Sequence, residues 1–216
     1  MLMWVIWNNR NNRVWNDLKE SGRSLRAKAR LLWEEWSSVN QHQRNNQPAE
    51  LLQQTQFWHK PSSGWYKCNV DAGFHRDLNK TSLGWCLRDH LGNFVMAGTG
   101  WREGNYSIVE GEALALFEAL KVMEQKGLSH VLVETDSKSV VNAIQHLRDG
   151  HSQFSVLIRS IKNVLLLHPN FKVSFIKRQA NMVAHTFARA ATSWSSRCIF
   201  ETLPPCIASI LSNEMS

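Results

Sequence analysis

The amino-acid sequence predicts an α/β domain in which helices flank a mixed sheet. The first expected strands are joined by a tight turn, as in an antiparallel hairpin, whereas the later strands are separated by helix-length stretches, as in parallel pairs. The chain has 216 residues, of which 43% are apolar. That composition suffices for a packed core and excludes wholesale disorder.

The strands are recognised by alternation of polar and apolar residues, and the helices by longer periodic stretches. The first strand has the sequence WYKCNVD, and the turn His90–Gly92 joins the second strand to the third. A strong helix follows and ends before Gly127. Strands are expected at 65–71, 81–89, 93–101, 129–136 and 171–177, and helices at 109–126, 138–147, 154–167 and 181–194.

The composition changes along the chain and predicts four segments. Residues 1–40 read as a Trp-rich helical extension, and residues 41–63 as a Gln/Asn-rich linker, since half of residues 41–56 are Gln or Asn. Residues 64–195 form the expected α/β domain. Residues 196–216 contain Pro204-Pro205 and read as a loose tail.

Several classes of protein are disfavoured. The longest apolar stretch, Leu2–Trp7, is far shorter than the roughly 20 residues that span a membrane, so neither a membrane span nor a secretory signal is expected. The four cysteines lack zinc-site spacing and are typical of an intracellular protein, in nucleus or cytoplasm, although a Cys198–Cys206 pair stays open. The net charge of +7 is compatible with a nucleic-acid partner. The chain is expected to be a monomer.

Three carboxylates are candidates for a functional site. Asp71 ends the first expected strand and Asp136 the fourth, at the edge where α/β sheets place their chemistry. Glu112 lies on the apolar stripe of the first helix, whereas Glu110 lies about 160° away and faces solvent. A buried carboxylate costs several kcal/mol unless it is paired or binds a metal.

These carboxylates together predict a site for hard divalent cations such as Mg²⁺. Two ions about 4 Å apart would activate a water and stabilise the leaving oxygen of a phosphodiester. The alternative is that Asp71 is a turn residue, Asp136 a helix cap and Glu112 an ordinary carboxylate at a helix N-terminus.

Five blocks in residues 65–194 carry a family resemblance. They are NVDAGF (69–74), GWCLRDHLGNFV (84–95), VEGEALALFEAL (109–120), VLVETDSKSVV (131–141) and VSFIKRQANMVAHTFARAA (173–191). In this order they resemble the ribonuclease H type-1 domain, in the divergent form of plant genomes and retrotransposon polyproteins.

The resemblance implies a ribonuclease H-like fold, with a five-stranded mixed sheet flanked by helices. It also implies hydrolysis of the RNA strand of RNA–DNA hybrids with two Mg²⁺ or Mn²⁺ ions. Asp71 would bridge both ions, and Glu112 and Asp136 would complete the pocket.

The fourth position departs from the family. The family's Asp in N-x-x-A-D is replaced by His185 in Asn181-Met-Val-Ala-His185, and the preceding loop, residues 177–180, lacks the His of active members. Imidazole suits Mn²⁺ better than Mg²⁺. His185 is therefore either a fourth ligand or a polar residue exposed at a helix start.

The N-terminal region carries a second, shorter resemblance. IWNNRN (6–11) and LLWEEW (31–36) resemble the connecting segment that precedes the ribonuclease H domain in non-LTR retrotransposon polyproteins. This resemblance implies a truncated or domesticated element.

Contacts to a hybrid would come from backbone donors, polar side chains and scattered basic residues. The candidates are Asn69, Gly73, Lys138, Lys177, Arg178 and Asn181. The short connection 148–153 leaves no room for the basic protruding helix of some relatives. Two readings stay open, a metal-dependent endoribonuclease and a weak or inert nucleic-acid-binding module. Protein interaction through the N-terminal helices is compatible with either.

Overall fold

The computed structural model describes residues 57–104, 106–146 and 150–214, together with Ser21, Gly22, Ser24 and Arg26. Gly22, Ser24 and Arg26 are helical, and Ser21 Oγ accepts the Ser24 N–H at 3.2 Å. The rest of the expected extension 1–40, the stretch 41–56 and the second resemblance lie outside the described residues. No helix in the described part is long and apolar enough to cross a membrane.

A mixed sheet of six strands forms the centre of the domain, in the order β5-β4-β1-β2-β3-β6. β1 pairs antiparallel with β2, as do β2 with β3 and β3 with β6, whereas β1 with β4 and β4 with β5 are parallel. The strands are β1 (Tyr66–His75), β2 (Lys80–Arg88), β3 (Phe94–Glu103), β4 (Val131–Thr135), β5 (Phe171–Phe175) and β6 (Cys198–Phe200). All five expected strands are present.

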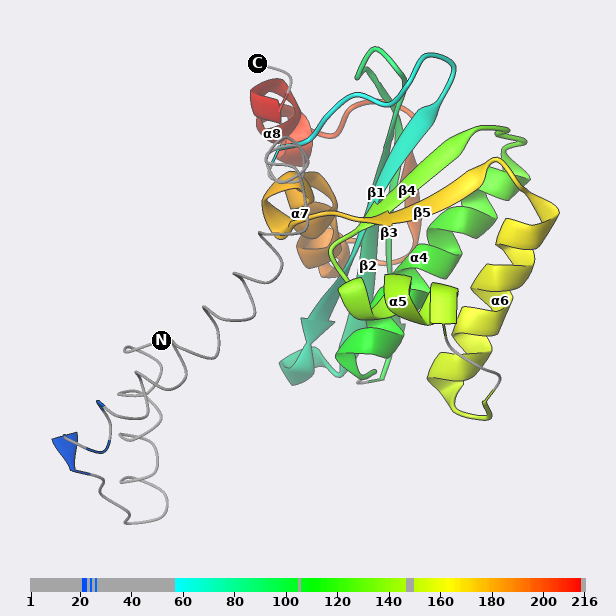
Figure 1. The fold of residues 1–216 in the computed structure, drawn as a ribbon. Coiled ribbons are helices and arrows are strands. Elements are labelled where there is room, and N and C mark those ends of the chain that lie inside the picture. The colour runs from blue at the N-terminus through cyan, green and yellow to red at the C-terminus, as the bar shows by residue number, and fades with distance from the viewer. Residues whose placement is uncertain are drawn as a thin grey trace. The chain divides into compact units, whose positions relative to one another are not determined.

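Helices cover both faces of this sheet (Figure 1). The helices are α4 (Ile108–Gln125), α5 (Lys138–His146), α6 (Gln153–Leu167), α7 (Met182–Ala190) and α8 (Pro205–Glu214), and short 3₁₀ turns lie at Arg76–Leu78, Arg178–Ala180 and Ala191–Ser193. The group of α4, α5 and α6 packs on one face, and α7 with α8 packs on the other. The architecture is that of the ribonuclease H-like fold.

α4 is the best specified helix. Ser107 accepts the Glu110 N–H, and the Glu110 side chain accepts the Ser107 N–H, so a complete capping box fixes the first turn. Its apolar stripe, which includes Leu116 and Met123, packs with Val70 of β1 in the larger core cluster. This helix therefore presents its N-terminal turns to β1.

The C-terminal segment corrects the expectation of a loose tail at 196–216. β6 extends the sheet beyond β3, which makes six strands rather than five. In α8, Ile207 and Leu211 are buried against Val183 and Phe187 of α7. Pro205 stands at the first helical position, where its missing N–H costs nothing. The double proline therefore marks the start of a helix rather than a loose tail. The sequence signal for this helix is the spacing of Ile207 and Leu211, four positions apart.

A chain of buried polar groups connects α8 to the sheet. Arg88, which is fully buried, donates to Glu214 at 2.5 Å and to Asn69 Oδ1 at 2.6 Å. Asn69 donates in turn to Glu134, which also pairs with Lys67 at 2.8 Å. Since each charge has a partner, the layer between the sheet and α8 tolerates this burial.

Glu214→Ala is expected to destabilise the domain by about 3 kcal/mol, because it leaves the Arg88 guanidinium buried without its counter-ion. Urea unfolding of the full chain measures this loss. Glu201→Ala is the matched control: Glu201 pairs with Lys126 at the surface, with a side chain 72% exposed, and should cost less than about 1 kcal/mol. Equal losses in the two variants would contradict the importance of the buried pair.

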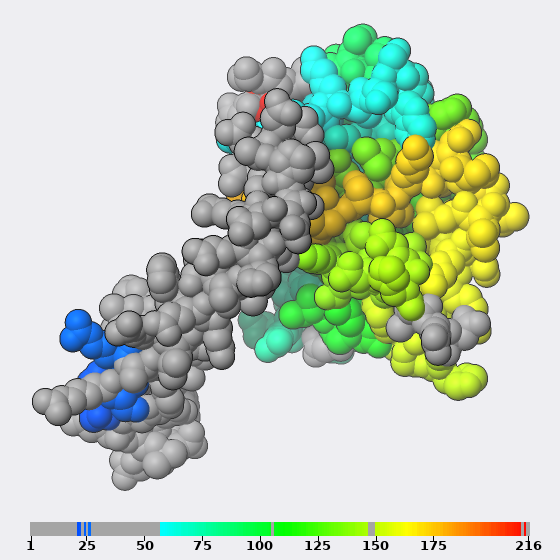
Figure 2. Space-filling model, in the orientation of Figure 1, coloured from blue at the N-terminus to red at the C-terminus, as the bar shows by residue number. Residues whose placement is uncertain are grey.

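The folded unit begins earlier than the expected linker 41–63 allows. Trp58 is 6% exposed and packs with Ile176 and Ala180, and Lys67 Nζ donates to the backbone oxygen of His59. The first described residues of this unit, cyan in Figure 2, form part of its surface. A single tryptophan in a polar stretch has no periodicity, so the sequence did not show this packing.

For the domain boundaries we propose that the linker is confined to residues 41–56. Limited proteolysis should then cut within this stretch and release a fragment that begins before Trp58 and keeps α8, because both are buried against the sheet layer. Mass spectrometry of the stable product gives both ends. A stable product that ends near residue 195, or protection of 41–56, would refute this division.

Candidate active site

The end of the parallel pairing between β1 and β4 brings two aspartates together. The last paired residues are Val70 and Thr135, and the next residues along the chain are Asp71 in β1 and Asp136, directly after β4. The sequence suggested that Asp71 ends its strand. In the structure β1 continues past it to His75, paired with β2. The two side chains thus lie where β4 stops beside a longer strand.

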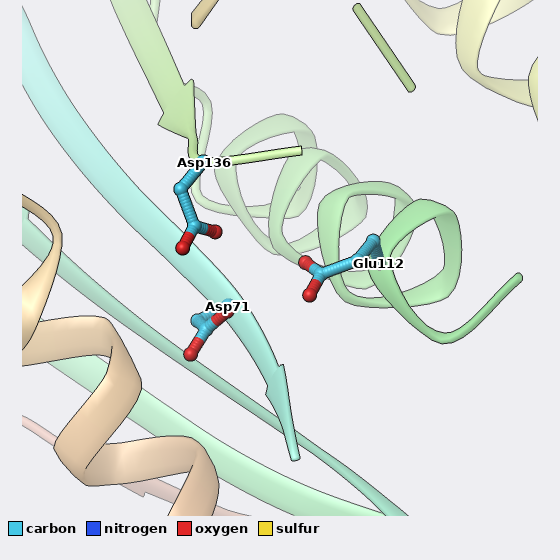
Figure 3. A group of neighbouring side chains, drawn as sticks. All are labelled: Asp71, Glu112 and Asp136. Carbon is cyan, nitrogen blue, oxygen red and sulfur yellow. The ribbon is translucent and has the colours of Figure 1, made fainter. Parts of the chain in front are cut away.

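Glu112 joins them from the N-terminal turns of α4. One ligand oxygen from each of Asp71, Glu112 and Asp136 can be chosen so that all lie within 4.8 Å of one another. Figure 3 shows the three carboxyl groups turned toward a common space between β1, β4 and α4. The structure therefore brings together the three carboxylates that the sequence singles out.

Close helix-to-strand contact makes this approach geometrically feasible. A Cβ on Gly111 would lie 2.6 Å from the Phe74 ring of β1, so a larger residue would have to displace this ring. Glu112 itself is 8% exposed and accepts the backbone N–H of Ala72. Its Oε2 atom is buried and has no hydrogen-bond partner within the described structure. An unpartnered buried carboxylate oxygen is costly unless a proton or a cation satisfies it.

The electrostatics of the pocket indicate a deficit of positive charge. Burial, with the negative charges of Asp71 and Asp136, raises the pKa of Glu112 to about 9. Burial and the charge of Asp136 raise the pKa of Asp71 to about 6, against the hydrogen bond from His185, which lowers it. Three adjacent carboxyl groups disfavour one another's ionisation in the absence of a cation.

The donor set fits a hard divalent cation. All the candidate ligand atoms are carboxylate oxygens, which Mg²⁺ and Mn²⁺ prefer. The unpartnered Glu112 oxygen gives a reason beyond proximity to place a cation here. Asp71, Glu112 and Asp136 are thus the residues that could hold it.

Glu110, two residues before Glu112, provides a contrast. Its carboxylate accepts from the Ser107 N–H at 3.0 Å and from the Ser107 hydroxyl at 2.6 Å. These hydrogen bonds lower the pKa of Glu110. As the sequence predicts, Glu110 is separate from the acidic group, and it serves the helix cap.

His185 lies beside this group but is not one of its members. Its Nδ1 is 2.6 Å from Asp71 Oδ2, and the Arg178 guanidinium contacts its ring. It is partly buried, so the expectation of an exposed polar residue at the helix start is not met. Among the described residues, the group of candidate ligands contains three carboxylates and no imidazole.

Asn181 was expected to contact nucleic acid, but it is fully buried at the start of α7. Its side-chain amide donates to the Val70 carbonyl at 2.9 Å and approaches Asp136 Oδ1 at 3.5 Å. The residue therefore joins α7 to the two strands that carry the aspartates, which is a positioning contact rather than a substrate contact.

Asn69 and Gly73 also do not face a substrate in this structure. The Asn69 amide is fully buried between Glu134 and Arg88. Gly73 is buried under α7, where an added Cβ would lie 2.9 Å from the Ala188 carbonyl oxygen. The strand pattern in the sequence could not show that α7 and α8 cover this face of β1.

The basic candidates remain accessible. Lys138 is exposed at the first position of α5, two residues after Asp136, and Arg178 is exposed beside His185. Lys177 is half-buried and precedes Arg178. These three residues are the candidate contacts of the expected set that solvent still reaches. The contact of Arg178 with His185 has no signal in the sequence, since it joins a 3₁₀ turn to a helix.

Comparison with known proteins gives one family and one fold. The family model described as "Reverse transcriptase-like" matches residues 69–191, which contain Asp71, Glu112 and Asp136. No curated protein sequence matches the chain.

Solved structures with a similar fold are ribonucleases H. RNase H1 from the halophilic archaeon Halobacterium salinarum has a TM-score of 0.54 at 19% identity, covering 59% of this chain and 97% of its own. The N-terminal RNase H domain of a Mycobacterium tuberculosis protein, solved as a fusion with maltose binding protein, has a TM-score of 0.52 at 17% identity, covering 59% and 93%. LC11-RNase H1, solved with an RNA/DNA hybrid, has a TM-score of 0.53 at 19% identity, covering 59% and 96%.

Proposed function

The chain belongs to the reverse transcriptase-like family and has the ribonuclease H-like fold, and from this premise we propose that it hydrolyses the RNA strand of RNA–DNA hybrids with a divalent cation. The observation that carries the proposal is the group of Asp71, Glu112 and Asp136, with the unpartnered oxygen of Glu112 inside it. A similar fold alone would support no chemistry.

The three carboxylates would hold the cation, Mg²⁺ or Mn²⁺. A bound divalent cation supplies the charge that activates a water and stabilises the leaving oxygen of a phosphodiester. The chain's own residues position these carboxylates. The Ala72 N–H donates to Glu112, and the Asn181 amide donates to the Val70 carbonyl and to Asp136 Oδ1. His185 holds one oxygen of Asp71.

The accessible basic side chains would approach the phosphates of the hybrid. Lys138 begins α5 two residues after Asp136, and Arg178, in the turn before α7, contacts the His185 ring beside Asp71. Basic residues of this kind give sequence-independent, salt-sensitive binding. We therefore propose that affinity for a hybrid falls steeply with added salt.

A second candidate function is that of a nucleic-acid-binding module with little or no catalysis. The contact of His185 with Asp71 favours it, because an imidazole stands where the family resemblance implies a fourth carboxylate. One fewer negative charge weakens the attraction of the pocket for divalent cations.

Cleavage of a labelled hybrid distinguishes the two functions. The full chain is incubated with the hybrid in Mg²⁺, in Mn²⁺ and in chelator, beside single-stranded RNA, RNA duplex and DNA duplex. Cation-dependent loss of the RNA strand of the hybrid alone supports the enzyme. Binding of the hybrid without cleavage in either metal supports the module.

A further inference from the structure

One oxygen of Asp71 is already occupied by a protein donor. The His185 Nδ1 atom lies 2.6 Å from Asp71 Oδ2, and both groups are largely buried. A carboxylate that bridges two cations must offer oxygens to both of them. In this chain the oxygen toward α7 receives a hydrogen bond instead.

Arg178 lies against the ring of His185. Its Nη2 atom lies 2.9 Å from His185 Nε2 and 3.2 Å from Nδ1. Because Nη2 is close to both ring nitrogens, the guanidinium lies against the ring rather than along the lone pair of one nitrogen. An ionised carboxylate only accepts, so the hydrogen-bond network assigns a ring proton to Nδ1, which donates to Asp71. Protonated Nδ1, the ring nitrogen at Asp71, has no lone pair to offer to a metal.

The pair also brings positive charge to this side of Asp71. The guanidinium of Arg178, which is exposed to solvent, contacts the imidazole that bonds to the buried carboxylate of Asp71. A divalent cation on the same side would meet both the charge of Arg178 and an oxygen that is already hydrogen-bonded. Repulsion between like charges at such distances is substantial in a partly buried pocket.

The opposite side of the pocket keeps its ligands. Asp71 has a second oxygen besides the one that contacts His185. This oxygen and the carboxylates of Glu112 and Asp136 remain for a cation, including the Glu112 oxygen without a partner. Mg²⁺ commonly binds through one or two carboxylates and completes its shell with water or phosphate. The remaining oxygens therefore suffice for one ion.

We propose that this pocket binds a single divalent cation, and that the Arg178–His185 pair takes the place of the second ion implied by the family resemblance. The proposal rests on the proposed function in that both assign the cation to the same three carboxylates. His185 is then not a metal ligand. It is a positioning residue that holds Asp71 through a hydrogen bond.

Binding stoichiometry tests the proposal without reference to activity. The full chain is titrated with Mn²⁺ by calorimetry, and electron paramagnetic resonance counts the free ion. One Mn²⁺ per chain is expected, with none in Asp71→Asn. His185→Asp, which removes the hydrogen bond and adds a carboxylate, should bind two. Circular dichroism of each variant verifies that it is folded.

The charge of Arg178 is tested by a matched pair of variants. Arg178→Gln should tighten binding of the single Mn²⁺ roughly three- to tenfold, because a nearby positive charge is lost. Lys177→Gln removes the same charge from the adjacent residue, for which the described structure shows no hydrogen bond to His185, and should change affinity less than about twofold. Equal effects of the two variants would overturn the role of the pair.

The outcomes separate this inference from the proposed function. Two ions in the natural chain would overturn the inference and leave hybrid hydrolysis intact. One ion in a chain that never cleaves hybrids would support the inference and contradict hydrolysis. A chain that binds no Mn²⁺ would overturn both.

Discussion

Asp71→Asn is expected to reduce hybrid cleavage at least about a thousandfold, because a metal ion contributes several kcal/mol of transition-state stabilisation and each 1.4 kcal/mol is about tenfold in rate. Asp71 lies at the centre of the acidic group and is the carboxylate that His185 contacts. The rate is measured on a labelled hybrid at saturating Mg²⁺. Asp89→Asn, in an exposed turn where Asp89 accepts from Asn93, is the control and should keep the natural rate.

A second pair of variants on one helix sharpens the same test. Glu112→Gln should lose activity as Asp71→Asn does, whereas Glu110→Gln should retain it, because glutamine preserves the capping box. The two changes remove the same charge, two residues apart. Retained cleavage in Glu112→Gln would show that the buried carboxylate is not used.

Mg²⁺ is expected to stabilise the folded chain far more at high pH than at low pH. Folding raises the pKa of Glu112 to about 9 and of Asp71 to about 6, both above their ordinary values. Without a cation, stability due to these groups is fully present below their ordinary pKa values. It is lost as the pH rises toward about 9, because the unfolded chain releases these protons more readily.

A bound cation replaces the protons and removes this penalty. At a hundredfold excess over its dissociation constant it should add about 2.7 kcal/mol near pH 8–9, or roughly 5–10 °C in melting temperature. Near pH 5 it should add little, since the carboxyl groups of Glu112 and Asp71 are still largely protonated. Thermal melts in Mg²⁺ and in chelator across this pH range measure the difference. A shift independent of pH, or one that persists in Glu112→Gln, would place the ion elsewhere.

Much of this structure could be predicted from the sequence because its signals are local. Alternation in WYKCNVD and the periodic stretch after Ser107 define β1 and α4, and all five expected strands are found. The convergence of the carboxylates also followed from simple rules. Asp71 and Asp136 come directly after paired residues of adjacent parallel strands, and Glu112 lies on the buried stripe of its helix.

The remainder depends on contacts between segments far apart in the chain. Asn69 was expected in the crevice, but its burial depends on Arg88 and on Glu214 at the end of α8. Arg178 and His185 are seven residues apart, and only the 3₁₀ turn between β5 and α7 brings them together. The position of a residue in the alternation of a strand indicates on which face of the sheet its side chain lies. It does not indicate which helix covers that face.

The most direct test of the central claim, a cation-dependent nuclease site made of three carboxylates, is the chemistry of the RNA ends that the full chain produces from a hybrid in Mg²⁺. Attack by an activated water leaves no cyclic phosphate, so mass spectrometry should find RNA fragments with linear phosphate and hydroxyl ends. These should be absent with chelator and with Asp71→Asn. Fragments with 2′,3′-cyclic phosphates, or equal cleavage by Asp71→Asn, would contradict the claim.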